Sequence, residues 1–364
     1  MSELERLAAS RLRRVPVYRP GAAAQHGTAG RLSSNEAALG PAPAIRAAVA
    51  ALGTLHRYPD AGAVAAHLAE DVGVTAEQIL LTNGSDELCY LLATLLLGPG
   101  RTAVVGDPCY QIDATASLLS GADLRRVPLV DGAHDLPAMV RAAQDASVVW
   151  LPSPHNPTGV ACDPQDLETF LNEVPPTCAV VLDEAYRAFT DPGLRPDIPR
   201  LLSRHPHLVV QRTLSKDWAL AGLRVGYVLA SQGLVRALRR ARPPFSVNSV
   251  ALAALHAGLG QEAWRGMAVD RVRHERTRLE HELGRVGIRY FPSQASFVTA
   301  RIDHARIAPP LAASRIAVRP GEDLGLPGWV RISIGWAPQM ALVRQALRRT
   351  ATVPHQQLPE RSAP

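Results

Sequence analysis

Short apolar runs alternate with amphipathic stretches over residues 40–230. The runs have the length of strands, and the stretches between them repeat apolar residues at helical spacing. We therefore predict strands at Ile79–Thr82, Thr102–Val105, Ser147–Leu151, Ala179–Leu182, Leu208–Gln211 and Val225–Leu229. We predict helices at Ala42–Leu52, Ala61–Glu70, Asp86–Leu97, Gln111–Leu119 and Pro164–Asn172. This alternation predicts an α/β fold with a mainly parallel sheet covered on both faces.

The pattern changes after Val228, where helical segments and short strands predict a smaller α+β lobe that shares the N-terminal residues. The helices are expected at Leu234–Arg240, at Ser249–Leu283 with a break at Gly258–Gly260, and at Gln339–Arg349. The strands are expected at Phe297–Arg301, Ala317–Arg319 and Val330–Ile334. The domains predicted are an N-terminal arm with part of the small domain (1–40), a large domain (41–245), a small C-terminal domain (246–350) and a disordered tail (351–364).

Length, charge and cysteine usage narrow the functional classes. A chain of 364 residues is long enough for two lobes, and it contains no apolar run that could span a membrane. The net charge of +6 comes from dispersed Arg, with one of the denser groups at Arg236–Arg242, and no nucleic-acid-binding motif accompanies them. The four cysteines lack CxxC spacing, so we expect no metal site and a reducing, cytoplasmic location.

The only lysine in the chain, Lys216, directly follows an apolar strand. A lysine amine held in a pocket at a strand end can lose its proton and form a Schiff base. The hydroxyl groups of Thr213 and Ser215 can bond an anion, and Arg224 adds a guanidinium suited to a phosphate. A Ser-Lys pair alone would also suit a surface turn.

Polar segments follow three other predicted strands. Asn83–Glu87 opens a helix, whose first backbone N–H groups form an anion site. Ser153–Gly159 follows the strand Ser147–Leu151, and Asp183–Tyr186 follows the strand Ala179–Leu182. Because carboxyl ends of parallel strands meet at one edge, we expect these segments to lie together with Lys216. A carboxylate, an amide, a phenol, a phosphate cradle and an amine form the set that pyridoxal 5′-phosphate (PLP) needs.

With these motifs the chain resembles the fold type I PLP-dependent aminotransferases, in the histidinol-phosphate aminotransferase subfamily, which includes aromatic-amino-acid aminotransferases. The resemblance extends from about Val17 to Arg348. The motifs that carry it follow one another in order: Pro16–Gly21, Leu32–Glu36, Arg57–Asp60, Asp107–Tyr110, Asn156–Gly159, Asp183–Tyr186 and Ser215–Arg224. The resemblance implies a large, mainly parallel-sheet cofactor domain and a smaller α+β domain.

The resemblance also implies a role for individual residues in cofactor chemistry. Lys216 would hold PLP as a Schiff base and then act as the base in proton transfer. Asp183 would pair with the protonated ring nitrogen. Asn156 and Tyr186 would hydrogen-bond the ring oxygen O3′, and Tyr110 would stack on the ring.

A second group of residues would bind the phosphate of the cofactor: Gly84, Ser85, Asp86, Thr213, Ser215 and Arg224. In the family, the tyrosine that matches Tyr58 reaches the cofactor phosphate of the neighbouring subunit. The resemblance therefore implies a homodimer with shared sites, with no nucleic-acid or membrane partner.

Arg331 matches the family arginine that receives the acidic group of the substrate. In histidinol-phosphate enzymes a second arginine, here Arg319, also faces the substrate phosphate, and Tyr18 and Asn35 complete the expected substrate site. Two guanidinium groups suit a phosphate dianion, although they also suit a carboxylate. The amino group would pass between an amino acid or amino-alcohol phosphate and a 2-oxo acid such as 2-oxoglutarate.

Other features leave the substrate open. Pro243–Ser249 and Pro292–Val298 resemble members that transaminate aromatic amino acids. Asp217–Trp218 stands where many members have Ala and an aromatic residue, and Ser296 stands where Asn is usual. The alternative reading is a PLP-dependent decarboxylase or decarboxylating deaminase of secondary metabolism on the same scaffold.

Overall fold

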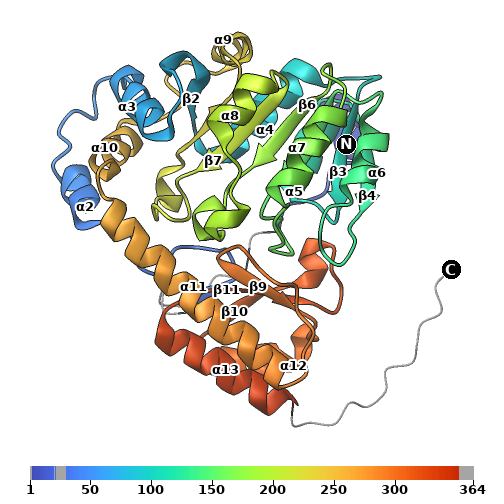
Figure 1. Cartoon of the computed structure of the whole chain (residues 1–364), viewed down its shortest axis with the longest axis vertical. Helices are drawn as coiled ribbons and strands as arrows, with labels where there is room; N and C mark the ends of the chain where they lie inside the picture. The colour runs from blue at the N-terminus through green and yellow to red at the C-terminus, as the bar shows by residue number, and fades with distance from the viewer. Residues whose placement is uncertain (1, 20, 22–29, 352–364) are drawn as a thin grey trace.

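The structure, a computed structural model, describes residues 2–19, 21 and 30–351. Two lobes are visible in Figure 1: a large one built on a seven-stranded sheet and a small one built on a four-stranded sheet. The long helix α11 (Glu262–Arg285) leads from the large lobe along the small one. Of the predicted disordered tail (351–364), Ala351 is instead the last residue of a helix, and residues 352–364 lie outside the described residues, as does Pro20 of the first motif.

The strands of the large sheet lie in the order β2-β8-β7-β6-β5-β3-β4. Their bounds are β2 (Ile79–Thr82), β3 (Thr102–Asp107), β4 (Asp123–Pro128), β5 (Val148–Pro152), β6 (Ala179–Asp183), β7 (Leu208–Thr213) and β8 (Gly226–Leu229). Only β8 runs antiparallel to its neighbours, so the prediction of a mainly parallel sheet is confirmed. The edge strand β4 was missed because its charged, half-exposed residues lack a clear apolar pattern.

Helices cover both faces of this sheet, as predicted for a parallel sheet. One face is packed by α2 (Pro43–Ala50), α3 (Gly62–Val72), α6 (Leu136–Ala143), α7 (Pro164–Glu173), α8 (Ile198–Arg204) and α10 (Ser249–Gly258). The opposite face is packed by α4 (Gly84–Leu96), α5 (Gln111–Leu119) and α9 (Gln232–Ala241). Short 3₁₀ turns lie at Ala76–Gln78, Arg187–Phe189, Pro192–Leu194, Ala221–Leu223 and Gly321–Leu324.

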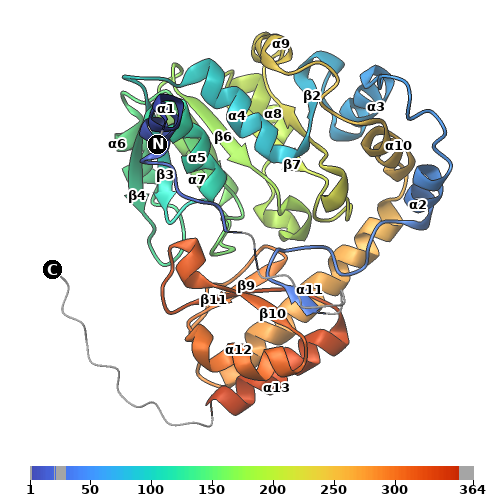
Figure 2. The same ribbon diagram turned by 180° about the vertical axis from the view of Figure 1, so that it is seen from behind.

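The small sheet has the order β1-β10-β11-β9. Its strands are β1 (Arg31–Leu32), β9 (Phe297–Ala300), β10 (Ala317–Pro320) and β11 (Val330–Ser333), and it packs with α11, α12 (His304–Ala313) and α13 (Ala337–Ala351). Because β1 pairs with β10, residues near the N-terminus belong to the small sheet. The first helix, α1 (Glu3–Leu12), lies on the far side of the large lobe, as Figure 2 shows.

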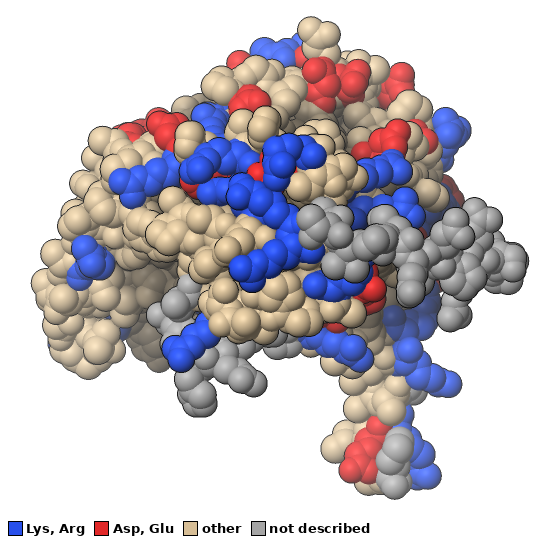
Figure 3. All heavy atoms as spheres, turned by 90° about the horizontal axis from the view of Figure 1, so that it is seen from below, with Lys and Arg blue, Asp and Glu red and all other residues tan. Residues whose placement is uncertain are grey.

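Much of the arginine excess has a structural role. Figure 3 shows basic side chains gathered on the face seen from below. Arg344 and Arg348 pair with carboxylates of α11. In the dense group of α9, Arg239 donates to the carbonyls of Ala76 and Ile79, and Arg242 donates to that of Leu81. Within the described ranges, the helices include none that is long and apolar enough to cross a membrane.

Candidate active site

A cavity of about 870 Å³ lies between the two sheets, at the carboxyl ends of β3, β5, β6 and β7. Segments of the N-terminal arm and strands of the small sheet close it from the other side. Most predicted site residues line it: Tyr18, Asn35, Ser85, Asp86, Tyr110, Asn156, Asp183, Tyr186, Thr213, Ser215, Lys216, Arg224, Arg319 and Arg331. Such a volume accommodates a cofactor together with a small substrate.

Asp183, the last residue of β6, lies buried at the floor of the cavity. Its Oδ1 accepts the backbone N–H of Ala185 at 2.9 Å, and its Oδ2 accepts Nε2 of Gln211 at 3.1 Å. Burial raises the pKa of Asp183 to about 7, although both hydrogen bonds lower it. This carboxylate therefore favours a positively charged partner in the cavity.

Lys216 follows β7 through a short turn and extends into the same cavity. Its Nζ donates to the carbonyl of Asn35 at 3.2 Å and lies 5.7 Å from the ring centre of Tyr186. Burial, together with the nearby charge of Arg331, lowers the pKa of Lys216 to about 8. A neutral amine, which is the nucleophilic form, is therefore accessible near physiological pH.

The start of α4 and the turn after β7 meet at one end of the cavity. Gly84 begins α4 with φ +73°, and a Cβ there would lie 2.6 Å from Nη2 of Arg224. Arg224 in turn donates to Ser215 Oγ at 3.5 Å and to Asp86 Oδ2 at 3.3 Å. Free helix N–H groups, hydroxyls and a guanidinium thus surround a space suited to an anion.

Hydrogen bonds place the aromatic residues that were predicted to contact the cofactor. Tyr110, at the N-cap of α5, donates through its hydroxyl to Asp86 Oδ1 at 3.0 Å. The Tyr186 hydroxyl accepts Nδ2 of Asn35 at 2.8 Å. Asn35 has a left-handed backbone (φ 53°), and its Oδ1 accepts the hydroxyl of Ser333 at 2.8 Å. An asparagine that tolerates this conformation therefore links the two lobes.

Two arginines of the small sheet form the other end of the cavity. Arg319 on β10 lies opposite Arg331 on β11 in the strand register, and both are buried. Arg331 donates through Nη1 to Asn156 Oδ1 at 2.7 Å and through Nη2 to the carbonyl of Ser33 at 2.9 Å. Arg319 donates to the carbonyl of Arg19 and lies 3.6 Å from Asp323. Arg319 is therefore a buried residue of the cavity wall and does not lie on the surface.

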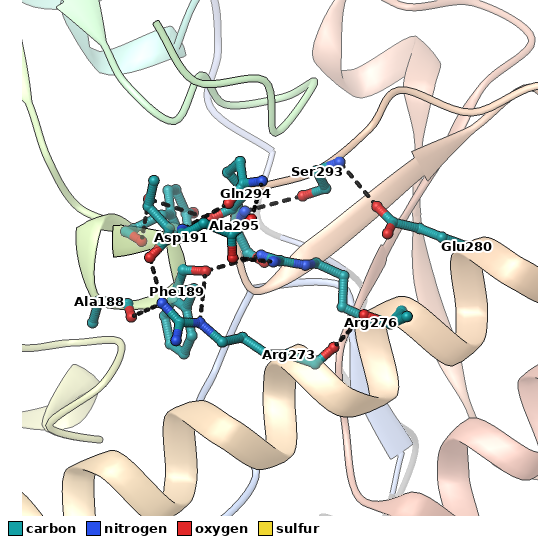
Figure 4. Close-up of polar contacts among 12 residues, drawn as sticks. Ala188, Phe189, Asp191, Arg273, Arg276, Glu280, Ser293, Gln294 and Ala295 are labelled. Atoms are coloured by element: carbon teal, nitrogen blue, oxygen red, sulfur yellow. Dashed lines mark hydrogen bonds and ion pairs between the residues drawn. The ribbon is translucent and has the colours of Figure 1, made fainter. Parts of the chain in front are cut away.

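The turn that carries Tyr186 is fixed to α11 by arginines (Figure 4). Arg273 donates to the carbonyls of Ala188, Phe189 and Thr190. Arg276 bridges the carbonyls of Phe189 and Ala295, both at 3.1 Å. The cavity floor and the small sheet are thus held by the same helix.

Some residues singled out in the sequence lie elsewhere. Tyr58 is 81% exposed and stacks on Phe245, with ring centres 4.4 Å apart, and neither residue lines the cavity. Asp217 and Trp218 do not line it: Trp218 is buried beneath the guanidinium of Arg265, and Asp217 lines neighbouring cavities. The departure after the lysine therefore affects packing behind the site.

Sequence reasoning missed residues that hold the site residues in place. Ser33 and Ser333 position Arg331 and Asn35, and Gln211 bonds Asp183. Ser33 lies inside the motif Leu32–Glu36, but no spacing in the sequence signals a bond between segments almost three hundred residues apart. Gln211 did carry a signal, since a lone amide stands within an apolar strand.

The chain matches the family model for aminotransferase class I and II over residues 30–349. It is 39% identical over 322 residues to histidinol-phosphate aminotransferase 1 of Dechloromonas aromatica, covering 88% of this chain and 89% of that protein. It is 37% identical over 341 residues to histidinol-phosphate aminotransferase of Geobacillus thermodenitrificans, covering 90% and 93%. The structure of the Sinorhizobium meliloti histidinol-phosphate aminotransferase in complex with PLP matches with a TM-score of 0.85 at 26% identity, covering 94% and 96%.

The fold and these matches define a fold type I aminotransferase, and the chain belongs to the class I and II aminotransferase family. Within that family it groups with the histidinol-phosphate aminotransferases. The predicted fold class and the predicted PLP-dependent aminotransferase class are confirmed. The cavity suits this cofactor, because a buried carboxylate, an amine and an anion cradle lie around one space. The roles of the individual residues remain predictions.

Proposed function

We propose that this enzyme holds PLP through Lys216, with Asp183 opposite the ring nitrogen and the cofactor phosphate among Ser85, Ser215 and Arg224. When bound, PLP withdraws electrons from the substrate carbon that carries the amino group. The support is the placement of a buried carboxylate, an amine and an anion cradle around one cavity.

The protein groups divide the remaining work. With PLP bound, Lys216, whose pKa is lowered, would accept a proton from the substrate carbon that bears the amino group and deliver it to the cofactor atom C4′. Asp183 keeps a positive charge on the ring nitrogen through its ionised carboxylate. Asn156 uses its Oδ1 to accept Arg331, so its Nδ2 is the donor left for the ring oxygen. Tyr186 offers its hydroxyl to the same oxygen.

We propose histidinol phosphate as the amino donor, with a 2-oxo acid such as 2-oxoglutarate as the partner substrate. The single observation that carries this choice is the buried register pair Arg319 and Arg331. The carboxylate of Asp323 offsets one of the two charges, so this end of the cavity retains a net positive charge for a substrate phosphate. The names of the related proteins agree with this assignment.

A substrate panel tests the proposal. Purified enzyme loaded with PLP is mixed separately with histidinol phosphate, phenylalanine, tyrosine and phosphothreonine, and loss of the visible absorbance of the lysine-bound cofactor is followed. We expect histidinol phosphate to give the highest kcat/KM, by at least about tenfold over the aromatic amino acids. A preference for phenylalanine or tyrosine would assign the aromatic activity, and release of carbon dioxide would assign the decarboxylase alternative.

We also propose a homodimer with shared sites. The support is the exposed aromatic pair of Tyr58 and Phe245, which lies outside the cavity of its own chain. Mixing inactive Lys216→Ala subunits with inactive Tyr58→Ala subunits should restore activity, because one site of the mixed dimer is then intact. Absence of restored activity despite subunit exchange would overturn the shared site. A cytoplasmic location remains a prediction.

A further inference from the structure

Three polar side chains that the proposed chemistry does not use lie buried beneath Asp183. Gln211 on β7 stands opposite Asp183 on β6 in the strand register, so both side chains leave the sheet on the same face. Cys89 comes from α4 and Asp113 from α5. All three are at most 2% exposed, and the helices that carry Cys89 and Asp113 pack on an otherwise apolar face of the sheet.

The contacts connect these side chains into a chain that ends at Asp183. Asp113 Oδ1 lies 3.6 Å from Cys89 Sγ, and Cys89 Sγ lies 3.5 Å from Gln211 Oε1. Gln211 Nε2 lies 3.1 Å from Asp183 Oδ2. The sulfur also lies 3.9 Å from the carbonyl of Ser85, the longest of its three contacts. The Gln211 amide is thus oriented with Oε1 toward sulfur and Nε2 toward Asp183, and this orientation is favoured when the thiol donates its proton to Oε1.

The thiol has one proton, so the protonation state of Asp113 decides how that proton is used. If Asp113 were ionised, the S–H would donate to its carboxylate, and Gln211 Oε1 would face sulfur without a donor. If Asp113 is neutral, its O–H donates to sulfur, and the S–H is free to donate to Oε1. Asp113 then donates to Cys89, Cys89 donates to Gln211 Oε1, and Gln211 Nε2 donates to Asp183.

The surroundings of Asp113 favour the neutral form. The ion pairs found among the described residues do not include Asp113, and the charged groups that shift its pKa, Asp183 and Asp86, are carboxylates. Burial, together with these carboxylates, raises the pKa of Asp113 well above its ordinary value, although the hydrogen bond with Cys89 opposes the rise. A buried carboxyl without a cation is stable as the acid.

We propose that Asp113, as a neutral acid, and Cys89 are positioning residues that hold the amide of Gln211 so that its NH₂ group donates to Asp183 and keeps that carboxylate ionised. The consequence is tighter binding of the cofactor, because an ionised Asp183 attracts the protonated ring nitrogen. This inference rests on the proposed role of Asp183 as partner of that nitrogen.

Cys89→Ala removes the donor, and Cys89→Ser restores one of similar size. We expect Cys89→Ala to raise the PLP dissociation constant of the apoenzyme by about 2- to 10-fold, and Cys89→Ser to return it to within about twofold of wild type. Cys178→Ala is the matched control, since Cys178 is equally buried but lies in the apolar core on the opposite face of the sheet. Equal effects of Cys89→Ala and Cys178→Ala, or no rescue by serine, would overturn the proposal.

The infrared difference spectrum of wild-type and Asp113→Asn apoenzymes at pH 8 tests the neutral acid directly. We expect it to contain the carbonyl stretch of a protonated carboxylic acid; carboxylate bands in its place would overturn the proposal. This measurement needs no cofactor, so it tests the proposal for Asp113 separately from the proposed function. If the wild type does not bind PLP at Lys216, the proposed function fails, whereas the infrared result still decides the state of Asp113.

Discussion

The two sheets contribute to the cavity in different ways. The large sheet supplies its chemical groups from strand ends and turns, where Asp183 and Lys216 are buried and their pKa values move toward neutrality from opposite sides. The small sheet supplies Arg319 and Arg331 from within paired strands, where the register holds their charges side by side. Lys216, which must change protonation, thus lies in a turn, whereas Asp183, Arg319 and Arg331, which stay charged, lie in paired strands.

The largest expected effect comes from removing Lys216, the amine in the turn after β7. Lys216→Ala should reduce kcat by at least about 10⁴-fold, because it removes both the covalent link and the proton-transferring base. The measurement is single-turnover kinetics, with circular dichroism to confirm folding. Since Lys216 is the only lysine, borohydride reduction of the loaded enzyme should label this one side chain. Activity within tenfold of wild type would contradict the assignment.

Removing Arg331 from the end of the cavity formed by the small sheet should weaken substrate binding without weakening PLP binding. We expect Arg331→Ala to lower kcat/KM by about 10²- to 10³-fold, since a buried charge that meets an anion is lost. The PLP dissociation constant should stay within about twofold of wild type. Arg331→Lys serves as the matched variant and should rescue poorly, because an ammonium lacks the planar pair of donors. Loss of bound PLP in Arg331→Ala would show that the two ends are not separate.

Arg319→Ala tests whether the arginines of the small sheet bind a substrate phosphate. If both guanidinium groups meet a phosphate, this variant should lower kcat/KM for histidinol phosphate at least about tenfold more than for phenylalanine. The two substrates are measured on the same preparation, so loss of folding cancels from the ratio. An equal loss on both substrates would assign Arg319 a structural role with Asp323 and Arg19.

The pH dependence of PLP capture by the apoenzyme measures how strongly Arg331 affects the pKa of Lys216. Only the unprotonated amine of Lys216 reacts, so the capture rate of the apoenzyme should rise about tenfold per pH unit and level off near pH 8. An unperturbed lysine would continue to rise to a pH of about 10. Because Arg331 contributes to the lowered pKa, the plateau should shift to higher pH in Arg331→Ala. An unchanged plateau would show that burial alone sets the pKa.

The smallest expected effect concerns the phosphate end. Gly84→Ala adds a Cβ at positive φ against the guanidinium of Arg224, whereas Gly100→Ala adds one at a similar φ (+76°) into open space. Both should lower the free energy of unfolding by about 1 kcal/mol. Only Gly84→Ala should weaken PLP binding, by a few-fold, as followed by cofactor fluorescence. Equal PLP affinities in the two variants would remove Gly84 from the cradle.

Much of the fold was predictable because its signals are local. Apolar runs marked β2, β3 and β5 to β8, and Gly258–Gly260 marked the break between α10 and α11. The missed strands lacked such signals, since β1 has two residues and β4 is charged. The helices α1, α6, α8 and α12 were also not predicted. The candidate site was predictable where its residues follow strands in recognisable motifs, as Asp183 and Lys216 do.

The sequence by itself determined which chemical groups this protein carries and that they stand at the ends of strands, because periodicity and motifs are properties of neighbouring residues. The tertiary structure decided their partners: Asn35 with Tyr186 and Ser333, Arg319 beside Arg331, and Gln211 beneath Asp183. These contacts join segments far apart in the chain. They depend on sheet order, strand register and the packing of α4 and α5, which arise only when apolar surfaces from the whole chain are buried together.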